Sequence, residues 1–213
     1  MLSESQVVQL LSPFGLALTS AQVGCLLTYL DLLLHWNRKI NLTAIRSPEE
    51  CVTRHFGESL YLARWIKLEG RLLDIGSGAG FPGLALKIVF PTLAVTLLEP
   101  VAKKRAFLKE VARACQMDSV EVRSERLEDF IRRGLPVAFD YVTVRAVGKL
   151  ERLVQGAARL LRLGGGLCLW VSREQAASLI GAEEWFHWEQ PIPLPLSHRR
   201  EIRVGIRTGS EPA

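Results

Sequence analysis

The sequence lacks paired cysteines. Its four cysteines, Cys25, Cys51, Cys115 and Cys168, are scattered through 213 residues, and no two of them form a C-x-x-C pair. This spacing indicates neither a zinc site nor a disulfide framework, so no metal ion is predicted. Scattered single cysteines are typical of a reducing compartment, and we expect the protein to be cytoplasmic.

Long apolar segments are also missing. The longest apolar run, residues 23–36, is interrupted by Asp31 and is too short to cross a bilayer. The first eight residues, MLSESQVV, have neither the basic region nor the apolar region of a secretory signal. We therefore expect no secretion and no membrane partner.

Acidic residues are the minority among the charged ones. The sequence has 27 Lys and Arg against 22 Asp and Glu, a formal net charge of +5, with basic clusters at residues 103–105, 132–133 and 198–200. An excess of this size favours a polyanionic partner such as RNA. Basic side chains on solvated helix faces would give the same count, so charge alone leaves both interpretations open.

The order of apolar and helical segments predicts an α/β fold. Residues 1–66 are predicted to form a helical N-terminal extension, with helix starts at Thr19-Ser20 and at Ser47-Pro48. Residues 67–213 are predicted to form the core of one compact domain. Its strands are expected near 71–75, 93–98, 119–123, 139–144 and 166–171, with helical segments between them, the last of them at 149–163.

Strands that alternate with helices imply a mostly parallel sheet with helices on both faces. The alternating residues 201–207 suit a closing antiparallel edge strand. The prolines in residues 185–196 exclude a central strand there.

A glycine-rich turn follows the first predicted strand, in the stretch LLDIGSGAGFPGL at residues 72–84. At the carboxyl end of a parallel strand, such a turn lets the backbone approach a ligand. The glycines fit two cofactors. Gly78, Gly80 and Gly83 spell the dinucleotide fingerprint G-x-G-x-x-G, whereas Gly76, Gly78 and Gly80 spell the G-x-G-x-G of S-adenosylmethionine-dependent methyltransferases.

Carboxylates around the turn favour S-adenosylmethionine. Asp74 would repel a pyrophosphate but attract the ammonium of a methionine moiety, directly or through water. Glu99 ends the next apolar run, where a carboxylate can accept hydrogen bonds from both ribose hydroxyls; a solvated strand end is the alternative. No tyrosine-lysine pair or well-placed histidine supports hydride transfer, so a nicotinamide-dependent oxidoreductase that uses Gly78, Gly80 and Gly83 is the second hypothesis.

Six ordered motifs then resemble one family, the small-subunit ribosomal RNA guanine-N7 methyltransferases, also known as glucose-inhibited division protein B. The likeness runs from about residue 30 to 170. The motifs are WNRKINLTAI at 36–45, RHFGESL at 54–60, LLDIGSGAGFPGLALKI at 72–88, LLEPVAKKRAFL at 97–108, RLEDF at 126–130 and FDYVTVRAVGKL at 139–150.

The resemblance implies a Rossmann-like class I S-adenosylmethionine-dependent methyltransferase fold with a mostly parallel seven-stranded sheet. It implies methyl transfer to N7 of a guanine in the 530 loop of bacterial 16S ribosomal RNA, with S-adenosylhomocysteine as the other product. The partner would be 16S RNA or the small ribosomal subunit, and we expect a monomer. A non-catalytic RNA-binding module is the third hypothesis.

The resemblance also implies cofactor contacts for five residues. Gly76 belongs to the glycine turn, Phe81 would line the methionine side, and Leu127 and Glu128 would edge the adenine. Plain core packing is the alternative for Leu127. Arg145, which follows the fourth strand, is expected where cofactor and substrate meet and is the predicted catalytic residue; a structural salt bridge is its alternative.

Guanine N7 carries a free lone pair, so the reaction needs positioning and no general base. Arg54, His55 and residues 103–105 are candidates for the surrounding phosphate-binding surface. Trp36 and residues 37–43 are expected to dock the N-terminal helices on the sheet, with an RNA contact as the alternative. RHFGESL departs from the family pattern at Gly57 and Glu58, which leaves the role of Glu58 open.

Overall fold

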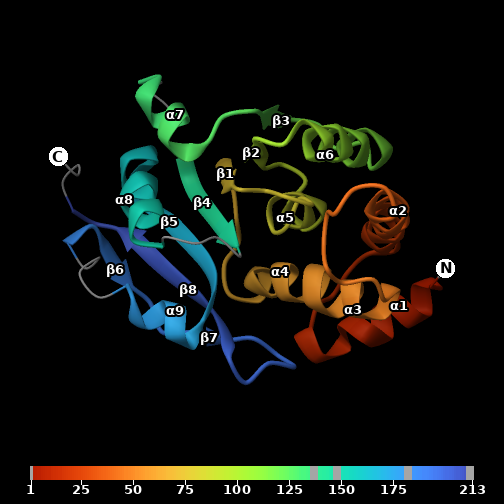
Figure 1. Cartoon of the computed structure of the whole chain (residues 1–213). Coiled ribbons are helices and arrows are strands. Elements are labelled where there is room, and N and C mark those ends of the chain that lie inside the picture. Colours follow the sequence, from red (N-terminus) through yellow and green to blue (C-terminus); the bar gives the residue numbers. More distant parts are fainter. Residues whose placement is uncertain (1, 135–138, 146–149, 180–183, 210–213) are drawn as a thin grey trace.

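The computed structural model describes residues 2–134, 139–145, 150–179 and 184–209, and a sheet flanked by helices forms its centre (Figure 1). The sheet has eight strands in this described part, in the order β3-β2-β1-β4-β5-β8-β6, with β7 paired to β8 beside this path. The strands are β1 (Arg71–Ile75), β2 (Ala94–Leu98), β3 (Val120–Arg123), β4 (Phe139–Arg145), β5 (Leu161–Ser172), β6 (Phe186–Trp188), β7 (Ile192–Pro193) and β8 (Arg200–Arg207).

The predicted α/β architecture is confirmed. Strands β1 to β5 pair in parallel, and β8 is antiparallel to β5, β6 and β7. The first four predicted strands agree with the observed ones within one residue at each end, and the fifth lies inside the longer β5. Parallel strands are buried on both faces, which gives them the continuous apolar runs that made them recognisable.

Three details of the predicted sheet are wrong. Residues 201–207 do form an antiparallel strand, but β6 covers its outer side, so β8 is not an edge. Among the described residues the sheet has eight strands instead of seven, because β6 pairs with only three residues of the eight-residue β8 and β7 pairs with two others. The helix predicted to 163 ends at Leu160, since Leu161 already pairs with Phe139 of β4.

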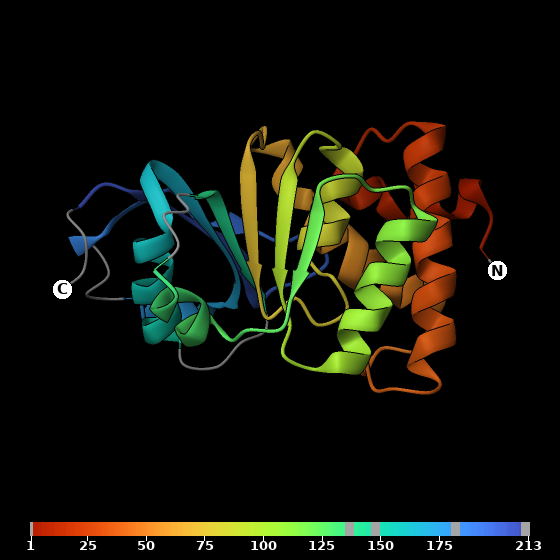
Figure 2. The same cartoon turned by 90° about the horizontal axis from the view of Figure 1, so that it is seen from above.

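Helices cover both faces of the sheet. Figure 2 shows α2, α5 and α6 on one side of β1 and β2, and α7 and α8 on the other. The helices are α1 (Glu4–Leu11), η1 (Ser12–Phe14), α2 (Ser20–Asn37), α3 (Pro48–Glu50), η2 (Cys51–Gly57), α4 (Glu58–Leu60), η3 (Tyr61–Arg64), α5 (Gly83–Val89), α6 (Ala102–Ala114), α7 (Leu127–Arg132), α8 (Leu150–Leu160) and α9 (Arg173–Ala177).

Alternation along the strands divides the core in two. Leu72 of β1 packs with the N-terminal helices, α5 and α6, whereas its neighbour Leu73 packs with α7 and α8 on the opposite face. The first of these clusters contains Val7, Leu26 and Phe56 together with Leu72, so the N-terminal helices share one continuous core with the sheet. The domain boundary at residues 66 and 67 stays a prediction.

Both predicted helix starts are confirmed. The Thr19 hydroxyl accepts a hydrogen bond from the Gln22 backbone N–H, and the Gln22 side chain accepts one from the Thr19 backbone N–H, which completes a capping box. The Ser47 side chain accepts a hydrogen bond from the backbone N–H of Glu50 at the start of α3. The sequence did not predict that this helix widens after one turn into the π-helix η2.

Tyr29 fastens α2 to the glycine turn. Its side chain is completely buried, its ring stacks on Phe81 with centroids 5.2 Å apart, and its hydroxyl donates a hydrogen bond to the Ala79 carbonyl. A helix of the N-terminal extension therefore supports the loop that follows β1.

Tyr29→Phe should lower the free energy of unfolding by about 1–3 kcal/mol, because the Ala79 carbonyl would stay buried without a donor. Urea unfolding measures this change. Tyr61→Phe is the matched control, since the hydroxyl of half-buried Tyr61 makes no hydrogen bond within the described residues. Equal unfolding free energies for the two variants would show that the Tyr29 bond does not stabilise the turn.

Candidate cofactor and substrate site

A pocket of about 250 Å³ opens where β1 and β2 end and α7 begins. The carboxyl ends of parallel strands meet at this edge, which is where ligands bind in open α/β sheets. Three of the residues expected at the cofactor, Gly76, Leu127 and Glu128, line it. The complete lining is Ile75, Gly76, Leu98, Pro100, Glu125, Arg126, Leu127, Glu128, Arg152 and Leu153.

The glycine turn exposes backbone at this edge. Gly78 has a φ of +55°, and a Cβ built on it would meet only the Gly76 carbonyl oxygen, at 3.8 Å. Gly80 has a φ of +87°, and a Cβ there would collide with the Tyr29 hydroxyl. One glycine thus keeps open space in front of the turn and the other permits close packing behind it.

Glu99 holds the turn from the neighbouring strand. Its Oε2 accepts the Gly78 N–H at 3.0 Å and its Oε1 accepts the Val101 N–H at 2.8 Å. The side chain is buried, so the alternative of a solvated strand end is wrong. Each carboxylate oxygen keeps a lone pair for a further donor, and the contact to the ribose hydroxyls stays a prediction.

Asp74 lies completely buried beneath the turn. Its Oδ1 accepts the hydroxyl of Thr143, its register partner on β4, at 2.7 Å, whereas its Oδ2 has no hydrogen-bond partner. Burial raises the pKa of Asp74 to about 6, although the nearby hydroxyls of Thr143 and Ser77, the Gly83 N–H and the charge of Arg145 oppose the rise. A buried carboxylate oxygen without a partner is costly, and a cationic ligand group would relieve that cost, directly or through water.

Phe81 lies between two other rings. Tyr29 stacks on one of its faces and His55 on the other, with the His55 ring centroid 4.9 Å away. Only 7% of the Phe81 side chain is exposed, and it does not line the 250 Å³ pocket. Its predicted role beside the methionine moiety therefore concerns the edge of its ring and stays a prediction.

His55 is held neutral. Burial, together with the charges of Arg145 and Arg54, lowers the pKa of His55 to about 3. Its Nε2 lies 2.7 Å from the Thr43 hydroxyl. An imidazole that is neutral, stacked and hydrogen-bonded is positioned to support the turn, not to bind phosphate as a cation.

Arg145 is a clamp between β4 and η2. Its guanidinium donates to the Arg54 carbonyl at 2.6 Å, the Ser59 hydroxyl at 3.0 Å and the His55 carbonyl at 3.3 Å. It also pairs with Glu58 at 3.2 Å, so the alternative of a structural salt bridge is correct. The charge of Arg145 still reaches Asp74, and its contact to cofactor or guanine stays a prediction.

Glu58 gathers three arginines. This buried carboxylate lies 3.2 Å from both Arg54 and Arg145 and 2.8 Å from Arg200. Burial raises the pKa of Glu58, whereas the three cations lower it. The role of Glu58 that the sequence left open is thus to hold segments from three parts of the chain together. Arg200 lies far from Glu58 in the sequence, and no local sequence pattern predicts that the two side chains meet.

Other candidates have structural contacts as well. Arg105 donates to the carbonyls of Glu99 and Pro100, which fixes the start of α6. Trp36 donates its indole N–H to Glu110, a contact that docks α2 on α6. Asn37 bonds only the loop after α2, so its docking role stays a prediction. Lys103 remains exposed in the first turn of α6.

The residues present fit S-adenosylmethionine. The unpartnered Asp74 oxygen suits an ammonium, the open space at Gly78 suits close backbone approach, and the pocket beyond Glu99 is bounded by Leu98, Leu127 and polar groups. In the part of the chain that the structure describes, no group of three or more His, Cys, Asp and Glu side chains could hold a metal ion.

Comparison with known proteins decides the family. A family model described as GidB, rRNA small subunit methyltransferase G, matches residues 22–193. The chain belongs to this family. It is 41% identical over 221 residues to ribosomal RNA small subunit methyltransferase G of Chloroflexus aggregans, covering 99% of this chain and 92% of that protein. The protein of the same name from Syntrophotalea carbinolica is 34% identical over 195 residues, covering 92% and 90%.

Solved structures share the fold. A SAM dependent methyltransferase from Aquifex aeolicus superposes with a TM-score of 0.59 over 74% of this chain and 93% of that chain, at 14% identity. A likeness at this identity concerns the fold alone, and it confirms the predicted Rossmann-like methyltransferase architecture.

Gly78→Ala should weaken binding of S-adenosylhomocysteine by on the order of tenfold or more, equal to about 1.4 kcal/mol, because the methyl group enters the space in front of the turn. Isothermal calorimetry measures the affinity. Gly134→Ala is the matched control: Gly134 has a φ of +61° and no neighbour within 4 Å of an added Cβ. Both variants should lose about 1–2 kcal/mol of stability. Unchanged affinity in Gly78→Ala would remove the turn from the cofactor site.

Proposed function

We propose that the chain transfers a methyl group from S-adenosylmethionine to N7 of a guanine in the 530 loop of 16S ribosomal RNA. The observation that carries the proposal is the glycine turn above Asp74, whose buried oxygen has no partner, in a chain of this methyltransferase family. The names of its relatives, ribosomal RNA small subunit methyltransferase G, support the choice of RNA.

The protein's part in this reaction is positioning. Bound S-adenosylmethionine supplies an electrophilic methyl group on a sulfonium. Guanine N7 attacks with a lone pair that carries no proton, so no side chain has to remove one. Asp74 would hold the ammonium of the cofactor's methionine part, and Glu99 would hold the ribose of its nucleoside part. Arg145 with Glu58 would keep β4 and η2 in place at the substrate side.

The geometry disfavours the two other hypotheses. Asp74 stands where a dinucleotide site would hold a pyrophosphate, and its charge opposes that ligand. A module that only binds RNA has no use for a buried carboxylate without a partner, which costs stability. We infer further that the enzyme acts as a monomer in the cytoplasm, on 16S RNA or on the small subunit. In the described residues, no helix is long and apolar enough to cross a bilayer.

Mass spectrometry of 16S RNA incubated with protein and isotope-labelled S-adenosylmethionine tests the proposal. We expect one labelled 7-methylguanine in the 530 loop, from naked RNA or from small subunits, and strongly reduced labelling by Asp74→Asn. Absence of labelling on both substrates would overturn the proposal. Tight NAD(H) binding without S-adenosylhomocysteine binding would instead establish the oxidoreductase, and RNA binding without either cofactor the binding module.

The pH dependence of cofactor binding should follow the ionisation of Asp74. The pKa of Asp74 in the free protein is about 6, above its ordinary value of 3.8, so the carboxyl is protonated as pH falls below about 6. The ammonium of the ligand binds the ionised Asp74 carboxylate, so a protonated Asp74 must lose its proton before the ligand binds. The affinity for S-adenosylhomocysteine should be constant well above this pH and fall up to about tenfold per pH unit below it.

Calorimetry at a series of pH values measures this profile. Asp74→Asn is the control, and it should bind more weakly at neutral pH and lose the dependence. The same profile in both proteins would mean that another group titrates and that Asp74 does not face the ammonium.

A further inference from the structure

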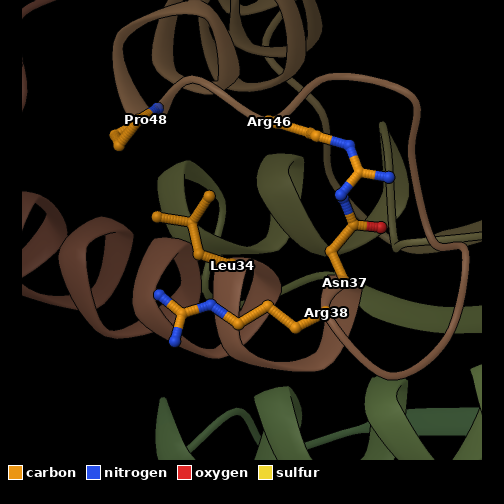
Figure 3. Close-up of a pocket in the computed structure, with 5 residues that line it drawn as sticks. All are labelled: Leu34, Asn37, Arg38, Arg46 and Pro48. Carbon is orange, nitrogen blue, oxygen red and sulfur yellow. The ribbon is translucent and has the colours of Figure 1, made fainter.

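A second pocket, of about 330 Å³, lies between the end of α2 and the loop that leads into α3. Figure 3 shows Leu34, Asn37 and Arg38 on the helix side and Arg46 and Pro48 on the loop side. Arg46 reaches from the loop toward Asn37, and Arg38 lies along the helix side. The pocket therefore presents two guanidinium groups from opposite walls.

Neither arginine is neutralised. Within the described residues the guanidinium groups of Arg38 and Arg46 make no hydrogen bond and no ion pair, and both residues are exposed. Of the nearby carboxylates, Glu49 accepts the Ser47 hydroxyl at 2.6 Å and Glu50 lies 3.5 Å from Arg54. Asp31 lines the adjoining pocket together with Arg38 but forms no ion pair with it. Two uncompensated cations in one concavity form a site for an anion.

The loop wall of the pocket is preorganised. Asn37 is buried, and its Nδ2 donates to the carbonyls of Thr43 and Ile45, at 2.9 and 3.3 Å. Its Oδ1 accepts the N–H groups of Leu42 and Thr43, at 2.9 and 3.0 Å. With all four bonds made, the backbone that carries Arg46 is fixed against the end of α2, so only the two arginine side chains have to be ordered when an anion binds.

The pocket also lies close to the glycine turn. Thr43, which Asn37 holds, contacts His55 at 2.7 Å, and His55 stacks on Phe81 inside the turn. Figure 2 shows the loop after α2 at the same edge of the molecule as the carboxyl ends of β1 and β2. A polyanion that reaches the cofactor edge can thus extend to this pocket along one face.

We propose that Arg38 and Arg46 bind a backbone phosphate of the RNA substrate, away from the target guanine. The proposal rests on the proposed function, because it assigns part of the RNA to this surface. Two fork-shaped guanidinium groups from opposite walls suit the oxygens of one phosphate or of two adjacent phosphates. Such a contact positions the RNA without reading its bases.

The test compares RNA binding by the wild-type chain, by Arg38→Gln/Arg46→Gln and by a control pair that also removes two charges. The control is Lys67→Gln/Arg113→Gln, two exposed residues near the amino ends of β1 and β3. The probe is an RNA hairpin that carries the 530 loop, and its affinity is measured at several salt concentrations. S-adenosylhomocysteine affinity is measured in parallel as a check of folding and of the cofactor site.

Arg38→Gln/Arg46→Gln should bind the hairpin on the order of tenfold more weakly at low salt. The slope of log K against log salt should become shallower by about 0.7 for each RNA phosphate that the variant no longer neutralises. S-adenosylhomocysteine affinity should stay at the wild-type value, and Arg38→Lys/Arg46→Lys should restore most of the salt slope because lysine keeps the charge.

Three results would overturn the proposal. One is wild-type RNA affinity and salt slope in Arg38→Gln/Arg46→Gln, and another is an equal weakening in the control pair, which would reflect net charge alone. The third is that inorganic phosphate binds the wild-type pocket, while Arg38→Gln/Arg46→Gln binds the RNA hairpin as tightly as the wild-type chain does. A wild-type chain that binds cofactor but no RNA would instead refute the proposed function itself, a result distinct from these three.

Discussion

The hydrogen bond from the Tyr29 hydroxyl to the Ala79 carbonyl is the contact on which the geometry of the site depends. A glycine-rich turn has few side chains of its own with which to hold a shape. Here the shape comes from outside the turn: Tyr29 and His55 enclose Phe81 from both sides, and Glu99 accepts the Gly78 N–H. The N-terminal helices therefore hold the glycine turn in place, although they are far from the strands in sequence.

Two buried acids at the same edge differ in how their charge is compensated. Asp74 has one oxygen unpaired, whereas Glu58 is shared by several cations. Glu58 is the structural one, because its partners already compensate its charge. The second oxygen of Asp74 has no such compensation, and buried groups of this kind are concentrated at functional sites.

Much of the fold could be predicted because its signals are local. Buried parallel strands have continuous apolar runs, helix starts have capping residues, and the glycine turn follows its strand directly. The contact between Arg145 and Glu58 could not be predicted in the same way, since Arg145 and Arg200 meet at Glu58 only after the chain has folded. The stacking of Phe81 is similar: a phenylalanine beside a glycine turn suggests a pocket wall, and only tertiary packing shows that both ring faces are covered.

The π-helix η2 makes the number of residues matter as much as their identity. A π-helix holds more residues per turn than an α-helix, so the side chains of Cys51–Gly57 are spaced differently around the helix axis than they would be in an α-helix. Removing one residue would change the direction of the side chains that follow, a rotation that amounts to about 100° per residue in an α-helix. Arg54 and His55 offer their carbonyls to Arg145 from this segment, so a deletion here would disturb the site even where every contacting side chain is retained. A change of one residue in length, which a loop would tolerate, would therefore displace the carbonyls that hold Arg145.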